Sequence, residues 1–202
     1  MEMLEREIKF YIEDLKKIAE RLRLCGANLG RPRILERNLR MDTSDQDLAR
    51  GGRLLRIRID DKVSVTYKAD ARVEGGVIAR TEIEFEADDD RMVRKLFEAL
   101  GYRVTVTYEK YRSRYTLGDV VVVLDELPFG DFVEIEAPNN TLIEGVSQML
   151  GLDFSKGMAI NYLGLFDIYK SNREVEFKDL TFKNFEGITV SPEDLKVQPA
   201  DK

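Results

Sequence analysis

The sequence predicts an α+β protein in which a closed eight-stranded antiparallel β-barrel carries helices packed on its outside. Most segments alternate between apolar and polar residues, which is the period of a strand with one buried face. Short turns join most of these segments, as antiparallel neighbours allow. A few longer segments instead repeat their apolar residues at helical spacing. A sheet of about eight strands is large enough to close into a barrel.

The strands are expected wherever alternation persists between turn residues, and the second of them is expected to begin after Pro32. In chain order they cover residues 4–10, 33–43, 53–61, 62–70, 77–87, 102–118, 119–130 and 131–138. A local repeat supports this order, because three times a strand ending in alternating acids leads into a helix that ends at a glycine. The repeat is too irregular for a solenoid, and it indicates a strand–helix unit reused around a curved sheet.

Three amphipathic helices are expected, at residues 12–26, 88–101 and 139–151, together with a short helical turn at 44–52. The second helix has an apolar stripe made of Met92, Val93, Leu96, Phe97 and Leu100. Asn139 or Asn140 is a suitable N-cap for the third helix. Residues 155–172 fit no simple pattern. We expect one main domain over 1–170 and a polar C-terminal extension of unknown role over 171–202.

The composition excludes several classes of site. The 202 residues carry a net charge of −6, which argues against a protein that coats nucleic acid. The chain has no histidine and one cysteine, Cys25, so His-dependent nucleophiles, zinc clusters and internal disulfides are excluded. A metal would be held by carboxylates, which favours Mg²⁺ or Mn²⁺. No apolar run is long enough to span a membrane and no signal peptide is evident, so a cytoplasmic protein is expected.

The polar faces of the expected strands carry charge that is sorted by sign. Because side chains alternate across a strand, residues two apart share a face. The shared faces are Glu5, Glu7 and Lys9; Arg56 and Arg58; Ser64, Thr66 and Lys68; Arg80, Glu82, Glu84 and Glu86; Lys110, Arg112 and Arg114; Asp125; and Glu134 and Glu136. Solvent exposure of one sheet face explains any single row. It does not explain like-signed neighbours within a row, which repel unless something bound offsets them.

If the barrel closes with these faces inside, its interior suits a charged ligand together with metal ions. Arg and Lys bind phosphate oxygens, and clustered carboxylates bind Mg²⁺ or Mn²⁺. This combination promotes phosphoryl or nucleotidyl transfer by positioning and charge stabilisation, without a protein nucleophile.

The motifs that carry these charges resemble those of the CYTH superfamily, the triphosphate tunnel metalloenzymes. "EREIKF" fits the ExExK signature, and the stretches "LLRIR", "VTYKAD", "RTEIEFE", "EKYRSRY", "VVVLDEL" and "GDFVEIE" follow in the family's order. The resemblance covers about residues 1–170 and is greatest to the class IV adenylyl cyclase branch. It departs where the family often has a Ser-Tyr pair, because this chain has Asn161 and Tyr162.

The resemblance implies a tunnel that binds a triphosphate with Mg²⁺ or Mn²⁺, and a homodimer. Catalytic roles fall to Lys9, Arg56 and Asp125. The implied substrate-binding residues are Lys9, Arg56, Arg58, Lys68, Arg80, Lys110 and Arg112, with Arg114 as a further candidate. The implied metal site comprises Glu5, Glu7, Glu82, Glu84, Glu134 and Glu136.

Four functions stay open at this point. The first is a cyclase that converts ATP to cyclic AMP and pyrophosphate. The second is a triphosphatase acting on inorganic triphosphate, thiamine triphosphate or a nucleoside triphosphate. A module that binds polyphosphate without turnover is the third, and a charged barrel without a ligand is the fourth. The carboxylates Glu5, Glu7 and Glu134 argue against a pure anion binder, which gains nothing from acids beside phosphate.

Overall fold

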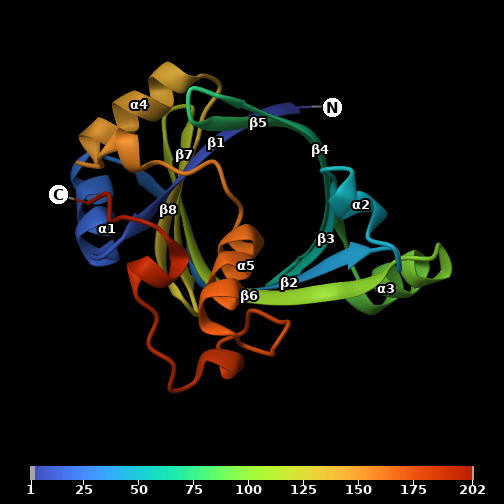
Figure 1. The fold of residues 1–202 in the computed structure, drawn as a ribbon. Coiled ribbons are helices and arrows are strands. Elements are labelled where there is room, and N and C mark those ends of the chain that lie inside the picture. Colours follow the sequence, from blue (N-terminus) through green and yellow to red (C-terminus); the bar gives the residue numbers. More distant parts are fainter. Residues whose placement is uncertain (1–2, 202) are drawn as a thin grey trace.

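The computed structural model describes residues 3–201, with side chains from Arg6 onward, and shows a closed barrel of eight antiparallel strands (Figure 1). The strands are β1 (Met3–Ile12), β2 (Asn28–Asp42), β3 (Leu54–Ile59), β4 (Val63–Glu74), β5 (Val77–Ala87), β6 (Arg103–Leu117), β7 (Val120–Leu127) and β8 (Gly130–Glu136). Around the barrel they follow the order β1, β5, β4, β3, β2, β6, β7, β8, and β8 pairs again with β1. The predicted fold class is confirmed.

Strand β2 begins earlier than expected. It starts at Asn28, before Pro32, and its pairing with β6 shifts register between Leu29 and Arg31 and again between Arg31 and Ile34. Proline cannot donate to a ladder and is tolerated in a strand at such irregularities. The strand therefore passes through Pro32 at a bulge instead of beginning after it.

The helices cover the barrel unevenly. They are α1 (Leu15–Leu24), α2 (Asp47–Arg50), α3 (Asp90–Ala99), α4 (Asn140–Met149) and α5 (Tyr162–Arg173), with short 3₁₀ turns at Phe154–Lys156, Lys183–Phe185 and Pro192–Leu195. Figure 1 shows α1 and α4 against β1, β7 and β8, and α2 and α3 beside the opposite wall. Ile18 and Leu22 of α1 and Ile143 of α4 are fully buried in one cluster with the outward side chains Ile8 and Val133.

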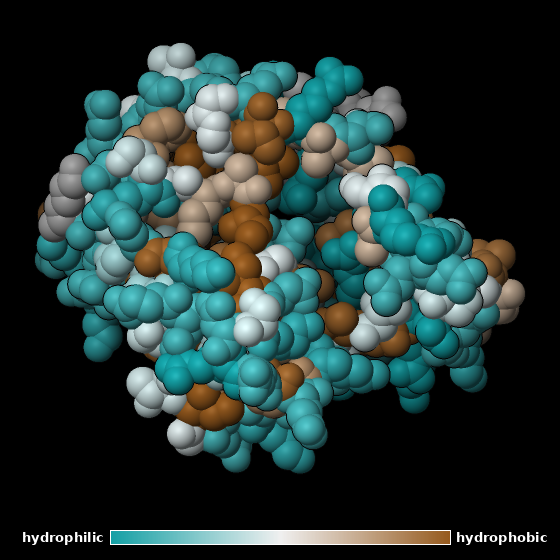
Figure 2. Space-filling model, viewed as in Figure 1, coloured by the Kyte–Doolittle hydropathy of each residue, from teal (hydrophilic) through white to brown (hydrophobic). Residues whose placement is uncertain are grey.

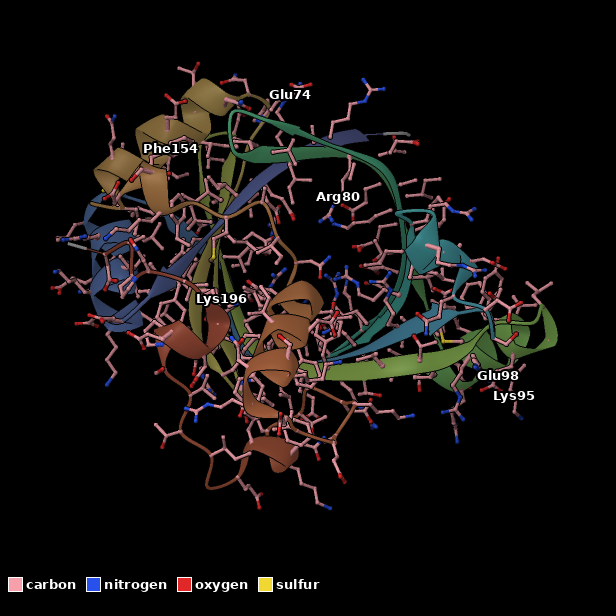
Figure 3. The ribbon with its side chains drawn as sticks, viewed as in Figure 1. Glu74, Arg80, Lys95, Glu98, Phe154 and Lys196 are labelled. Atoms are coloured by element: carbon pink, nitrogen blue, oxygen red, sulfur yellow. The ribbon has the colours of Figure 1, made fainter. Side chains whose placement is uncertain are left out.

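Helix α3 splits its apolar stripe. Val93 and Phe97 pack against the outer face of β2 and β3, in a cluster with Met41 and Ile57. The remaining stripe residues and the outward side chains near the end of β5 face solvent. Their exposed fractions are 61% for Met92, 59% for Leu96, 63% for Leu100, 49% for Ile83 and 55% for Phe85. The helices therefore cover only part of the apolar outer face. The charged side chains Lys95 and Glu98 of α3 point away from the barrel (Figure 3).

The segment after α5 packs against the barrel and hydrogen-bonds to the edge of β6. The expected boundary at 170 falls inside α5, which ends at Arg173. Strand β7 pairs with β6 only from Tyr111 onward, so the preceding part of that β6 edge is available to another segment. The N–H of Leu180 donates to the carbonyl of Thr107 (2.9 Å), and the N–H of Glu109 donates to the carbonyl of Leu180 (2.8 Å). The segment after α5 thus covers an open strand edge, which would otherwise invite pairing with another chain.

Replacing Phe185 with Ala is expected to lower the free energy of unfolding by about 3–5 kcal/mol, the usual result of deleting a buried aromatic ring. The ring is 5% exposed and lies 5.2 Å, between centroids, from both Tyr169 and Phe177. Urea unfolding measures the loss, and Ile188→Ala, at a side chain 37% exposed, is the matched control. Equal stability of Phe185→Ala and wild type would mean that the C-terminal segment adds nothing to the core.

A second prediction concerns the β7–β8 turn. Burial raises the pKa of Asp131 to about 6, and the neighbouring Glu126 adds to the increase. Because the folded pKa exceeds the unfolded value of 3.8, the folded state binds more protons in that interval, and stability falls as the pH rises from about 4 to 6. Asp131→Asn is therefore expected to be more stable than wild type at pH 7.5, by about 1 kcal/mol after solvent screening. Melting temperatures at pH 7.5 and pH 4 measure this, and an advantage that does not shrink at pH 4 would contradict it.

Candidate active site

The barrel encloses a cavity of about 810 Å³, and its lining includes eleven basic and six acidic side chains. Figure 2 shows the hollow in the middle of the molecule, between α5 and the wall formed by β3 and β4. The lining therefore has a positive balance although the whole chain carries −6. Such a concave basic interior concentrates an anionic ligand.

Three carboxylates form a cluster where β1 meets β8. Glu7, Glu134 and Glu136 each place one carboxylate oxygen within 4.8 Å of the others. The register of the two strands causes this, because Glu7 lies opposite Glu136, and Lys9 lies opposite Glu134. Glu7 is 1% exposed, and its Oε2 atom is buried without a hydrogen-bond partner. Three close acids with an orphaned oxygen fit a hard divalent cation such as Mg²⁺ or Mn²⁺.

Glu5 was predicted as a further metal ligand. Its backbone lies in β1 opposite Arg80, but its side chain lies outside the part of the chain that the structure describes. The predicted ligands Glu82 and Glu84 lie on β5 and do not join the cluster. Glu82 lies 2.8 Å from the Nζ atom of Lys68, and Glu84 accepts hydrogen bonds from Arg58 (3.1 Å) and Thr66 (2.6 Å).

The strand order explains these contacts of Glu82 and Glu84. Cross-strand pairs place Glu82 beside Lys68 and Glu84 beside Thr66, because β5 is the neighbour of β4. Burial by itself raises the pKa of Glu84, but Arg58 and the Thr66 hydroxyl outweigh it and keep that pKa below its usual value. These two acids therefore act in this structure as partners of the basic wall formed by β3 and β4.

Two cations hold the acid cluster in place. The Nζ atom of Lys9 donates to Glu7 (2.7 Å) and lies 3.3 Å from Glu134. Arg80 donates to the same oxygen of Glu7 at 2.7 Å, and Figure 3 shows its side chain directed from β5 into the ring. Burial tends to lower the pKa of Lys9, but Glu134 and Glu7 outweigh it and raise the pKa above its usual value. Lys9 therefore remains a cation beside the cluster.

Asp125 lies apart from the carboxylate cluster and anchors a second group of cations. It is fully buried and accepts a two-pronged hydrogen bond from Arg112 (2.7 and 2.5 Å) and one from Lys110 (3.1 Å). The hydroxyl of Tyr162, at the start of α5, also donates to it (2.7 Å). Burial raises the pKa of Asp125, but Arg112 and Lys110 outweigh it and keep the pKa below its usual value. Asp125 therefore holds Lys110 and Arg112 in position, and its catalytic role stays a prediction.

The remaining predicted cations line the same cavity. Arg56 donates to the hydroxyl of Thr66 (3.0 Å), and Arg58 and Lys68 face Glu84 and Glu82 across the sheet. Arg114 also lines the cavity, but its side chain is exposed. The predicted substrate-binding residues therefore share one cavity; they lie on β1, β3, β4, β5 and β6.

Several lining residues were not predicted. Glu36 and Arg40 of β2 line the cavity, and so do Tyr108 and Tyr162. The sequence signal for the β2 residues was present, because Glu36, Asn38 and Arg40 alternate in "ERNLR" and their strand was already expected. For Tyr162 the only signal was its place in the pair Asn161-Tyr162 where the family often has a Ser-Tyr pair, since its segment fitted no simple pattern.

The closed antiparallel barrel thus places basic rows and the carboxylates Glu134 and Glu136 in one interior cavity, an arrangement that suits a polyanion with a cation. The chain belongs to the CYTH family, because residues 3–142 match the CYTH domain. Members of this family act on triphosphates as cyclases or triphosphatases, and membership implies dependence on a divalent metal.

Known proteins agree with this assignment. A protein of Methanocaldococcus jannaschii, provisionally named an adenylate cyclase, is 30% identical over 136 residues, which is 66% of this chain and 77% of that protein. A solved structure from Pyrococcus horikoshii is 26% identical, with a TM-score of 0.69 over 80% of this chain and 97% of that chain. Another, provisionally named an adenylate cyclase, from Vibrio parahaemolyticus, has a TM-score of 0.72 at 17% identity, over 83% and 99% of the two chains.

A Hippeastrum structure matches with a TM-score of 0.58 at 19% identity, over 81% of this chain and 95% of that chain. That protein carries the provisional name of an adenylyl cyclase, and it is described as having a dominant triphosphatase activity.

Within residues 3–201, no helix combines the length and the apolar character needed to cross a membrane.

Proposed function

We propose that the protein is a metal-dependent adenylyl cyclase of the class IV type, which converts ATP to cyclic AMP and pyrophosphate. The main support is the carboxylate cluster of Glu7, Glu134 and Glu136, because Glu134 and Glu136 line the same cavity as two sets of basic side chains. Carboxylates beside a phosphate site are unfavourable unless a cation lies between them, so the two features together favour a metal-bound triphosphate. The relative from M. jannaschii is provisionally named an adenylate cyclase, which agrees with this proposal.

The basic residues would bind the triphosphate and stabilise the charge that develops on the leaving pyrophosphate. Arg112 suits a two-pronged contact with phosphate oxygens, since Asp125 already fixes its guanidinium plane. Lys9 lies between the cluster and the cavity, and it would neutralise charge nearest the reacting phosphorus. Arg56, Arg58 and Lys68 would hold the rest of the chain from the opposite wall.

Glu7, Glu134 and Glu136 would hold Mg²⁺ or Mn²⁺. When bound, such a cation supplies Lewis acidity and lowers the pKa of an attacking hydroxyl or water. The protein's own contribution would include keeping Glu134 ionised. Burial raises the pKa of Glu134, but Lys9 and Arg112 outweigh it and keep it well below its usual range, so this carboxylate is charged at neutral pH.

A triphosphatase is the second candidate. The same walls would hold the same chain, but water would attack the terminal phosphorus in place of the ribose 3′-hydroxyl. The Hippeastrum protein supports this candidate, because it is named as an adenylyl cyclase but described with a dominant triphosphatase activity. The difference depends on which phosphorus lies beside the carboxylate cluster.

Product analysis tests the proposal. The pure protein is incubated with ATP, inorganic triphosphate and thiamine triphosphate, each with Mg²⁺ or Mn²⁺, and the products are separated. Cyclic AMP with pyrophosphate is the expected result from ATP. Orthophosphate from any substrate without cyclic nucleotide would replace the cyclase with a triphosphatase. Tight binding without turnover of any substrate would overturn both in favour of a binding module.

A further inference from the structure

Two inward-facing residues of β2 have buried polar groups that the described part of the protein does not satisfy, and a third lies beside them on the same face; the three are named here the β2 row. The row consists of Glu36, Asn38 and Arg40. Glu36 is 1% exposed, and neither of its carboxylate oxygens has a hydrogen-bond partner among residues 6–201. Asn38 is fully buried with both amide atoms unpartnered. Arg40 donates to the carbonyl of Arg53 (3.1 Å), and no described carboxylate forms an ion pair with it.

Several other carboxylates of the barrel interior do have hydrogen-bond donors, unlike Glu36. Glu7, Glu84, Asp125 and Glu134 each accept a hydrogen bond from a lysine or an arginine. Glu36 also has cations nearby, but its Oε2 atom lies 3.7 Å from the Nζ atom of Lys110 and 4.0 Å from the Nε atom of Arg112. These distances allow attraction but exceed hydrogen-bond length. Glu36 is therefore a cavity-lining carboxylate whose capacity to accept hydrogen bonds is unused.

The charge state of Glu36 makes that unused capacity significant. Burial by itself raises the pKa of Glu36, but Lys110 and Arg112 outweigh it and hold the pKa below its usual value. The carboxylate is thus ionised at neutral pH. An ionised buried carboxylate without hydrogen bonds is unfavourable, so the site favours a ligand that brings donors to it.

A bare triphosphate chain does not meet this requirement, because its oxygens are acceptors and carry negative charge. A nucleoside does meet it, since ribose hydroxyls and exocyclic amino groups are donors, and ring nitrogens accept from a guanidinium such as that of Arg40. We propose that Glu36 accepts a hydrogen bond from the nucleoside part of the substrate, so that the tunnel selects nucleoside triphosphates over inorganic triphosphate. This inference rests on the proposed function only in requiring that the tunnel binds a triphosphate.

The test compares two substrates in one variant. Glu36→Gln keeps the shape of the side chain and removes its charge. The value of kcat/KM for ATP is expected to fall about 10-fold, because the substrate's hydrogen bond to a carboxylate becomes a weaker bond to a neutral amide oxygen. The value for inorganic triphosphate is expected to stay within about threefold or to rise, because a negative charge near phosphate is removed. Glu144→Gln, at an exposed site on α4, controls for the change of charge.

Two outcomes would overturn the inference. Equal losses for both substrates would assign Glu36 to positioning Lys110 and Arg112, and no loss for either would give it no role. Calorimetric binding of ATP and of inorganic triphosphate provides a readout that does not depend on turnover. If wild type converts neither substrate, the proposed reaction fails, whereas the change in the binding ratio still decides the role of Glu36. Glu36→Met provides a second uncharged variant of similar size should Glu36→Gln fail to fold.

Discussion

The variant Glu7→Gln is expected to lose about 100-fold or more of its metal-dependent turnover while keeping its fold, a loss typical of removing one charge-stabilising group. The glutamine carbonyl can still accept from Lys9 and Arg80, which both bind the Oε1 atom at 2.7 Å. The amide nitrogen then takes the place of the orphaned Oε2 atom. Since an amide N–H₂ cannot bind a cation, the change affects the metal and leaves the hydrogen bonds from Lys9 and Arg80 in place.

Turnover measured against Mg²⁺ and Mn²⁺ concentration tests this prediction, with circular dichroism as the check on folding. The expected signature is a higher metal requirement together with a lower maximal rate. Glu20→Gln is the matched control, because that side chain is 63% exposed on α1. Normal turnover and normal metal dependence in Glu7→Gln would mean that the carboxylate cluster does not hold the metal that the reaction uses.

The variant Asp125→Ala is expected to lose about 3–5 kcal/mol of stability, the range for breaking a buried ion pair from one side. The substitution leaves the ammonium of Lys110 and the guanidinium of Arg112 without their shared anion, and the Tyr162 hydroxyl without its acceptor. For a protein of this length the loss corresponds to a decrease in melting temperature of roughly 6–20 °C.

Thermal and urea unfolding measure this loss, and Asp45→Asn at an exposed loop position is the control. Tyr162→Phe separates the contributions, because it keeps every charge and removes only one donor, so a smaller loss is expected. If Asp125→Ala were as stable as wild type but inactive, Asp125 would be a catalytic group and not the anchor described above.

The sequence was sufficient to predict the barrel and the residues that face its interior. Alternation places Glu7, Lys9, Arg56 and Glu134 on inward faces whatever the order of the strands, and the structure finds each of them near or in the cavity. The pairing of acids with bases could not be predicted in the same way, because it depends on which strands are neighbours. The resemblance assigned Glu82 to the metal site, and only the strand order shows that β5 places it beside Lys68.

Two other features depend on contacts between distant parts of the chain. Tyr162 reaches Asp125 across 37 positions of sequence, from a segment without a clear period. The C-terminal segment looks polar, yet Leu180 and Leu195 are fully buried, because the unequal lengths of β6 and β7 leave an edge for it to cover. No local pattern in the sequence records that difference in length.

The ion pairs inside the tunnel have a consequence for the influence of salt. A free basic cleft collects dissolved anions, and a polyanion that binds there releases them, which makes its affinity fall steeply with ionic strength. In this tunnel Lys68 already has Glu82, and Arg58 has Glu84. These acids are counterions that are covalently attached to the protein, so an arriving polyanion displaces carboxylates instead of dissolved chloride. Its affinity should therefore depend on salt much less than the number of its basic contacts suggests.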